Sequence, residues 1–237
     1  MREMFNLVQA AQHVCMEANE LRHFAQRGEI KAEKRADDWW FDHRELDEWA
    51  QRHLLETPGK RFGTLHNAIM NDMGREHRAS WRVAGLFRPD AMSLDIKAKT
   101  KGGMIRDMAD LAIACGLVYD DEGFYKELVA REEAASTAIG GGAAFLHPRY
   151  HDPYFFEDTF VAYGRSRRDV FFGAPEGEGT RHFFLVCSTD HENHLRILAR
   201  LAMLAHGTDL MERLDAAETV EDAMQAIAEC EEELCGE

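Results

Sequence analysis

Two segments that carry histidines hold the residues whose types and spacing could do chemistry. The first, REEAASTAIGGGAAFLH (131–147), ends a helical pattern, passes through three consecutive glycines and places His147 at the end of a short apolar run. The second, HENHLRILARLA (191–202), places His194 in the first turn of an expected amphipathic helix. A neutral imidazole is a competent nucleophile near pH 7, and its phosphoramidate can pass the group on. The pattern predicts that His147 accepts and transfers a phosphoryl group, with His194 nearby.

Phosphoryl transfer needs in-line positioning and donors for the negatively charged oxygens, and little covalent chemistry from the protein. Hydroxyls and glycine N–H groups before His147 could bind those oxygens: Ser136, Thr137, Gly140 and Gly142. Arg131 could add a charge-assisted hydrogen bond. The N-terminus of a helix favours an anion, so His194 could orient His147 or donate to its phosphate.

The same residues also have structural interpretations, which the spacing alone leaves open. A histidine at the end of a strand is often structural or merely exposed, and three glycines in a row are more often a turn than an anion cradle. Arg131 could simply end its helix favourably. Neither a P-loop nor a dinucleotide fingerprint is present, because GK[ST] and GxGxxG are both missing from the sequence.

A metal site is the rival interpretation of the histidines. The spacing His147-x3-His151, followed by an aspartate, and the spacing His191-x2-His194 both resemble those of metal ligands. Prolines next to both ends of the first group make a shared helix face improbable there. We therefore expect no metal, and we expect no other cofactor. A metal-dependent enzyme is kept as an alternative hypothesis for the function.

The composition is that of an ordinary globular protein: 45% of the 237 residues are hydrophobic and 30% are charged. An apolar run of about 18 residues is missing, as is an apolar signal segment at the start, so we expect a cytoplasmic protein that does not bind membranes. The five cysteines are scattered without a CxxC pair, which indicates free thiols in a reducing compartment.

The net charge of −15 is unevenly distributed. Residues 59–88 carry six lysines and arginines against two acidic residues, whereas residues 89–237 carry 14 against 29. An acidic body argues against non-specific nucleic-acid binding by the whole surface, although the middle segment could form a basic stripe. Prolines bracket this segment. The sequence predicts a first domain over 1–58, a basic and partly helical linker over 59–85, and a second domain over 86–237.

The first domain reads as two helices, a hairpin and a third helix. With GEI (28–30) after the second helix and FDHRELDEW (41–49) after the hairpin, it resembles the small winged helix-turn-helix of the excisionase and MerR-like group. The resemblance covers roughly residues 5–55. It implies a set of DNA-binding residues on the second helix and the wing: Arg22, Gln26, Arg27, Lys34 and Arg35. Carboxylates among these positions would repel phosphates, so a protein-docking or dimerising module is the alternative.

The second domain alternates helix and strand, which predicts an α/β fold with helices packed around a mainly parallel or mixed sheet. The expected strands are 143–147, 159–163 and 182–187. The expected helices are centred on 104–112, 124–131, 195–204 and 219–227.

The stretch that ends at His147 follows the pattern REExxSTxIGxGxAxPH of a known family. The residues in register are Arg131, Glu132, Glu133, Ser136, Thr137, Ile139, Gly140, Gly142, Ala144 and His147. Together with 86–101, 172–187 and the C-terminal helices, it resembles the IIA domain of the bacterial sugar phosphotransferase system, of the fructose/mannitol/nitrogen-regulatory class. The resemblance implies that His147 is phosphorylated and that His194 is the second active-site histidine. Leu146 stands where the family usually has proline, and Pro148 follows the histidine.

That resemblance implies a mixed sheet flanked by helices and a phosphocarrier that accepts the group from an HPr-type donor. The domain would then transfer the group to a IIB partner or signal its phosphorylation state, with transcription control through the first domain as one output. Signalling is the favoured role because no IIB or membrane segment is fused here. The alternative is a DNA- or protein-binding regulator that is not phosphorylated and keeps the IIA fold as a scaffold.

Overall fold

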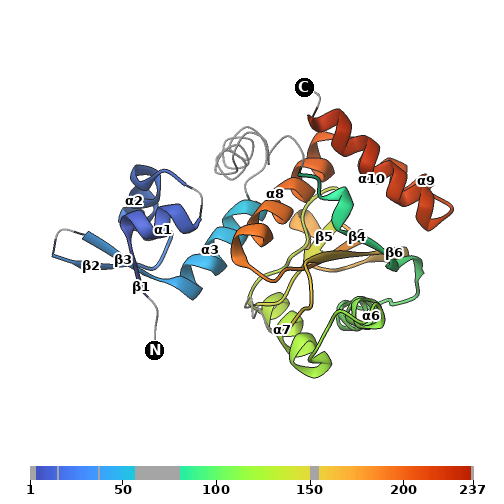
Figure 1. Cartoon of the computed structure of the whole chain (residues 1–237), viewed down its shortest axis with the longest axis horizontal. Helices are drawn as coiled ribbons and strands as arrows, with labels where there is room; N and C mark the ends of the chain where they lie inside the picture. The colour runs from blue at the N-terminus through green and yellow to red at the C-terminus, as the bar shows by residue number, and fades with distance from the viewer. Residues whose placement is uncertain (1–3, 15, 37, 57–80, 150–154, 236–237) are drawn as a thin grey trace. The chain divides into compact units, whose positions relative to one another are not determined.

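The computed structural model describes residues 4–14, 16–36, 38–56, 81–149 and 155–235 (Figure 1). The chain divides into two compact units, Met1–Trp81 and Arg82–Glu237, here called the N-terminal and the C-terminal unit. Most of the predicted basic linker, residues 59–80, lies outside the described residues. In the part of the chain that is described, no helix is long and apolar enough to span a membrane.

The N-terminal unit consists, in chain order, of β1 (Met4–Asn6), α1 (Leu7–His13), α2 (Ala18–Arg27), β2 (Glu33–Arg35), β3 (Asp38–Asp42) and α3 (His43–Glu56). Asn6 caps α1, because its side chain accepts from the backbone N–H of Gln9 at 2.9 Å while the Gln9 side chain accepts from the N–H of Asn6. Gly28 ends α2 in the left-handed region at φ 71°. The strands form an antiparallel sheet in the order β1-β3-β2.

The C-terminal unit is built on a four-stranded sheet in the order β4-β6-β7-β5. Its strands are β4 (Phe87–Ile96), β5 (Ala143–Leu146), β6 (Phe160–Val170) and β7 (Thr180–Cys187). β4 runs parallel to β6 and β5 parallel to β7, whereas β6 and β7 are antiparallel. The predicted mixed sheet is therefore confirmed.

Helices cover both faces of this sheet (Figure 1). α6 (Lys101–Ala114) and α7 (Asp121–Ala134) pack on one face, and α8 (His191–Gly207) and α10 (Val220–Cys235) lie on the other. The short α9 (Leu210–Ala216) connects the last two helices, and two short 3-10 helices lie at Ala84–Leu86 and Pro175–Gly177. The result is a three-layer α/β/α unit.

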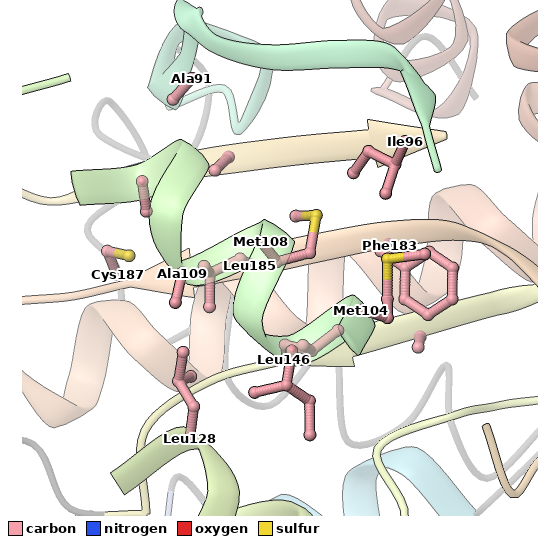
Figure 2. Close-up of a cluster of buried hydrophobic side chains, with 14 of the residues drawn as sticks. Ala91, Ile96, Met104, Met108, Ala109, Leu128, Leu146, Phe183, Leu185 and Cys187 are labelled. Atoms are coloured by element: carbon pink, nitrogen blue, oxygen red, sulfur yellow. The ribbon is translucent and has the colours of Figure 1, made fainter. Parts of the chain in front are cut away.

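The core between the sheet and α6 and α7 fixes which way each residue of β5 points. Met104 and Met108 of α6 and Leu128 of α7 pack against Leu146 and Phe183 from the sheet (Figure 2). Side chains alternate between the two faces of a strand. Leu146 faces α6 and α7, so the next position is directed toward the layer that contains α8.

One strand and one α-helix of the C-terminal unit, β4 and α9, were not predicted, and β6 is longer than expected. β4 carries Pro89 and an irregular burial pattern as an edge strand, so it has no alternation to detect. α9 is only seven residues long, which is too short for a helical period to show. β6 continues to Val170. The prediction ended the strand too early because its exposed second half, with Arg167 and Arg168, has the polar sequence of a loop.

Candidate functional site

His147 follows the last residue of β5, at the C-terminal end of the strand. Its Nδ1 lies 2.8 Å from the carbonyl oxygen of Phe145, and its Nε2 lies 2.9 Å from Nε of Arg131. A carbonyl only accepts hydrogen bonds and a guanidinium only donates them. The proton of the neutral ring is therefore on Nδ1, and the lone pair is on Nε2.

Arg131 reaches this ring from the last turn of α7. Its side chain is buried, and Nη1 donates to the carbonyl oxygen of Ala135 at 2.9 Å while Nε donates to His147. The guanidinium is thus anchored on one edge and directed at the nucleophilic nitrogen on another. A donor-only group at this point stabilises the ring form whose Nε2 carries the lone pair.

His194 comes from the first turn of α8. The centroid of its ring lies 4.9 Å from that of His147, with an edge-to-face angle of 61°. Asp190 caps this helix, because its side chain accepts from the backbone N–H of Asn193 at 2.8 Å. The structure therefore brings Arg131, His147 and His194 together, and the third of them lies at the positive end of a 17-residue helix.

Both histidine rings are buried in this structure. The side chain of His147 is only 1% exposed, and that of His194 is fully buried. The two hydrogen bonds of His147 hold the ring inward, with the Arg131 guanidinium over Nε2. Attack on a phosphorus atom consequently requires that the groups over Nε2 move aside.

The glycine-rich loop is not at the ring. Residues 137–139 run antiparallel along β5, since Ile139 donates to the carbonyl of Ala143 at 2.9 Å and Phe145 donates to that of Thr137 at 3.0 Å. Gly140 and Gly142 therefore lie at the reversal before the strand begins, and His147 lies past its other end. At about 3.3 Å per residue, the strand separates them by roughly 13 Å. The predicted phosphate contacts of both glycines are corrected accordingly.

The two hydroxyls expected to bind phosphate have other partners. Oγ1 of Thr137 donates to Oε2 of Glu132 at 2.6 Å. Oγ of Ser136 donates to the carbonyl oxygen of Phe172 at 3.0 Å. Both hydroxyls thus stabilise the segment that flanks β5, and neither is directed at His147.

Glu132 and Lys101, for which the sequence predicts no role, are linked to Thr137. The carboxylate of the buried Glu132 accepts from the backbone N–H of Thr137 and from its hydroxyl. Its other oxygen lies 2.6 Å from Nζ of Lys101, the first residue of α6. The only signal in the sequence is that Glu132 follows Arg131 in the REE motif. Nothing in that motif indicates that this carboxylate turns inward.

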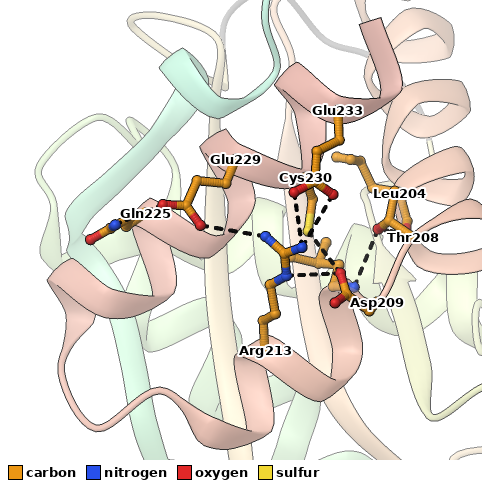
Figure 3. Close-up of polar contacts among 9 residues, drawn as sticks. Leu204, Thr208, Asp209, Arg213, Gln225, Glu229, Cys230 and Glu233 are labelled. Atoms are coloured by element: carbon orange, nitrogen blue, oxygen red, sulfur yellow. Dashed lines mark hydrogen bonds and ion pairs between the residues drawn. The ribbon is translucent and has the colours of Figure 1, made fainter. Parts of the chain in front are cut away.

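The metal interpretation gains nothing in the C-terminal unit. His151 lies outside the described residues. Asp209, Cys230 and Glu233 are close enough together to hold an ion. The guanidinium of Arg213 lies among them, with Nε 2.8 Å from the Asp209 carboxylate and Nη2 2.9 Å from that of Glu233 (Figure 3). An arginine already supplies the cation there, so this group does not fit a metal.

The residues predicted to bind DNA are all exposed on the N-terminal unit: Arg22, Gln26, Arg27, Lys34 and Arg35. The first three lie on α2 and the last two on β2. Nε of Arg27 lies 2.7 Å from the carboxylate of Glu29, and Nη2 of Arg35 lies 2.6 Å from that of Glu33. These carboxylates compete with phosphates for both arginines.

The fold and the buried histidine pair define the class of the C-terminal unit: an α/β domain with two histidine rings side by side at the C-terminal end of β5. The chain belongs to the family described as "Phosphoenolpyruvate-dependent sugar phosphotransferase system, EIIA 2", whose model matches residues 85–230, more than half of the chain. The predicted IIA domain of the fructose/mannitol/nitrogen-regulatory class is confirmed over these residues.

Similar proteins include a fructose-specific EIIA component from Haloferax volcanii, 30% identical over 142 residues, which are 59% of this chain and 90% of that protein. A fructose-specific EIIABC component from Bacillus subtilis is 27% identical over 145 residues, 60% of this chain. The matched part spans only 22% of that longer protein. A nitrogen regulatory protein from Bradyrhizobium diazoefficiens is 26% identical over 149 residues, 62% of this chain and 94% of that protein.

Solved structures share the fold. Nitrogen regulatory protein IIA-Ntr from Neisseria meningitidis superposes with a TM-score of 0.55 at 22% identity, over 61% of this chain and 98% of that one. The enzyme IIAMTL of Escherichia coli, solved in complex with phosphorylated enzyme IIBMTL, gives 0.54 at 20% identity, over 60% and 97% of the two chains. Neither structure shows a winged helix-turn-helix in the N-terminal unit.

Proposed function

We propose that the C-terminal unit is a phosphocarrier that takes a phosphoryl group on Nε2 of His147 from the phosphohistidine of an HPr-type protein. The observation that carries the proposal is the state of the ring: the Nδ1 proton is held by the Phe145 carbonyl, and the Nε2 lone pair is directed at Arg131. The membership in the EIIA 2 family supports the same reaction.

The transfer step is balanced without a proton acceptor. The Nε2 lone pair forms the new N–P bond while the N–P bond of the donor breaks, and the electron pair of that bond stays on the donor nitrogen. The Nδ1 proton of His147 remains on the ring throughout and keeps its bond to the Phe145 carbonyl. The phosphorylated ring is a cation that this carbonyl oxygen stabilises.

Arg131 has two tasks in this reaction. At rest, its Nε–H donates to the lone pair that must attack, so it has to release Nε2 when the donor arrives. Its guanidinium can then donate to the phosphoryl oxygens, since the side chain stays anchored through Ala135. The ring of His194, with its centroid 4.9 Å from that of His147, is close enough to donate to the same group.

Incubation with phosphoenolpyruvate, enzyme I and HPr tests the proposal by intact mass. We expect the mass of one phosphoryl group, labile in acid, and its loss in His147→Ala. His206→Ala is the matched control, because this histidine is exposed at the far end of α8. A wild-type protein that stays unlabelled while an established IIA domain is labelled in the same mixture would refute phosphotransfer. It would leave the scaffold alternative.

The downstream partner of the phosphorylated unit is a IIB-type acceptor or a regulated protein. The support for a IIB-type acceptor is the shared fold with IIAMTL, whose structure was solved with phosphorylated IIBMTL. Adding a purified IIB domain to the labelled protein distinguishes the two roles. Label that moves to the IIB domain indicates transport, and label that stays on His147 indicates signalling.

A winged helix-turn-helix role for the N-terminal unit is the second candidate function. Its support is the layout of α1, α2 and the β1-β3-β2 sheet, with the Arg22, Gln26 and Lys34 side chains exposed. If these residues bind the DNA backbone, the affinity for DNA falls steeply as the salt concentration rises. Arg22→Ala and Lys34→Ala should each reduce the salt slope by about one. Lys126→Ala, on the C-terminal unit, is the control.

Failure to bind any DNA at low salt would leave the N-terminal unit as a docking or dimerising module. If DNA does bind, the same assay with His147-phosphorylated protein tests transcription control. An affinity that does not change on phosphorylation would exclude a phosphorylation-dependent switch.

A further inference from the structure

We infer that Glu132, together with Lys101 and Thr137, positions the phosphoryl-accepting imidazole by fixing the carbonyl that holds its Nδ1 proton. This rests on the proposed function of His147. Glu132 does not touch the ring, so it is a positioning residue. Such a role accounts for the burial of an acidic side chain next to Arg131.

The first link is a carboxylate with two hydrogen-bond donors on one oxygen and an ammonium beside the other. Oε2 of Glu132 accepts from the N–H of Thr137 at 3.0 Å and from its hydroxyl at 2.6 Å. Oε1 pairs with Nζ of Lys101 at 2.6 Å. The Glu132 side chain is 4% exposed and that of Lys101 38%. A buried carboxylate that is paired with an ammonium and accepts two hydrogen bonds is a well-fixed anchor for Thr137.

The second link runs from Thr137 to the ring. The carbonyl of Thr137 accepts from the N–H of Phe145 at 3.0 Å, and the carbonyl of Phe145 accepts from Nδ1 of His147 at 2.8 Å. Because β5 has only four residues and is the last strand of its sheet, the segment 137–139 is what holds its outer edge. The position of Thr137 therefore sets where the Phe145 peptide, and with it the Nδ1 acceptor, lies.

The third observation is the divergence of two neighbours on α7. Arg131 donates to Nε2 of the ring, whereas Glu132 binds the segment that flanks the strand behind it. One helical turn thus fixes the hydrogen-bond partners of both nitrogens of His147. Arg131 contacts Nε2 directly, and Glu132 acts on Nδ1 through Thr137 and Phe145. Lys101 adds a tie to the same place from α6, and its ammonium also lies 5.1 Å from the ring centroid of Phe172.

Thr137 offers the sharpest pair of variants. Thr137→Val keeps the shape but removes the hydroxyl donor, and Thr137→Ser restores that donor. Thr180→Val is the matched control, because Thr180 is equally buried and its hydroxyl has no partner among the described residues. Glu132→Gln and Lys101→Met test the other two members. An amide has a single acceptor oxygen, so glutamine is unable to serve Lys101 and Thr137 together.

The readout is the ¹⁵N NMR spectrum of the His147 imidazole in the full chain, with unfolding midpoints measured alongside. We expect one ring form, protonated on Nδ1, in the wild type, in Thr137→Ser and in Thr180→Val. In Thr137→Val and Glu132→Gln we expect a mixture of the two tautomers. In these two variants the rate of single-turnover phosphorylation by HPr should fall about tenfold, with an unchanged KM. A tenfold change in rate corresponds to about 1.4 kcal/mol in the transition state.

Wild-type tautomer populations in a folded Thr137→Val variant would overturn the inference, and so would an equal change in Thr180→Val. Should Glu132→Gln fail to fold, Thr137→Val still decides the matter. The NMR signal does not depend on phosphotransfer. A protein whose tautomer shifts as expected but which is never phosphorylated would keep this inference and refute the proposed function.

Discussion

Replacing Glu231 removes the acceptor that secures the start of the C-terminal unit. This carboxylate is fully buried on α10, where it accepts from the N–H groups of Val83 at 2.9 Å and of Ala84 at 2.8 Å. Its Oε1 also lies 3.5 Å from Nε of the buried Arg200 of α8. Three elements that are distant in sequence therefore meet at one carboxylate.

The cost follows from what each variant leaves unpaired. Glu231→Gln keeps one acceptor oxygen and turns an NH₂ group toward the other donors, which costs about 1–3 kcal/mol. Glu231→Ala removes the acceptor of one buried and one partly buried N–H group and the carboxylate beside the Arg200 guanidinium. Breaking a buried pair in this way costs about 3–5 kcal/mol. For a unit of this size, each kcal/mol lowers Tm by about 2–4 °C.

Far-UV circular dichroism during heating or in urea measures the loss of stability. Tryptophan fluorescence is unsuitable, because all four tryptophans lie at or before residue 81 and report on the N-terminal unit. Glu232→Ala is the control, since this neighbour is exposed and should stay within about 0.5 kcal/mol of wild type. The expected order of destabilisation is alanine, then glutamine, then the control. An alanine variant within about 1 kcal/mol of wild type would show that Glu231 does not anchor the start of the unit.

Three further changes have defined outcomes. Gly164→Ala should lower the unfolding free energy by about 1–3 kcal/mol, because a Cβ there would overlap the side chains of Ile96 and Met108; urea unfolding checks it, and wild-type stability would contradict the overlap. Burial lowers the pKa of His182 to about 4 from its ordinary 6.5, so the unfolded chain binds more protons between these values. The unfolding free energy should therefore fall as the pH drops from about 6.5 to about 4, by on the order of 2–3 kcal/mol, and His182→Gln should flatten that part of the curve. Arg213→Met removes ion pairs to three carboxylates (Figure 3), but these groups are exposed to solvent, so the loss of stability should be small and should shrink in high salt.

The sequence alone was sufficient to identify the second domain as α/β and to place it in its family. The reason is local: a motif with Arg131, His147 and a glycine turn between them is contiguous in the chain, and the buried strand 182–187 is a short apolar run. The second histidine was found in the same way, because a helix start is signalled by the residues around it.

Only the tertiary structure decided what surrounds the imidazole. The glycines read as a phosphate cradle by their distance along the chain, yet the antiparallel pairing of 137–139 with β5 carries them to the far end of the strand. Whether a side chain such as Glu132 turns inward depends on the donors that other elements bring to it. Here those donors are Lys101 from α6 and Thr137 from the flanking segment.

The closed state of His147 has the same origin. Types and spacing along the chain determined which groups can react, because nucleophilicity and charge belong to the residues themselves. Burial and hydrogen-bond direction belong to the packing of α7, β5 and α8, which are separated in sequence by up to sixty residues or so. That packing determined the tautomer, the guanidinium over Nε2 and the need for the site to open.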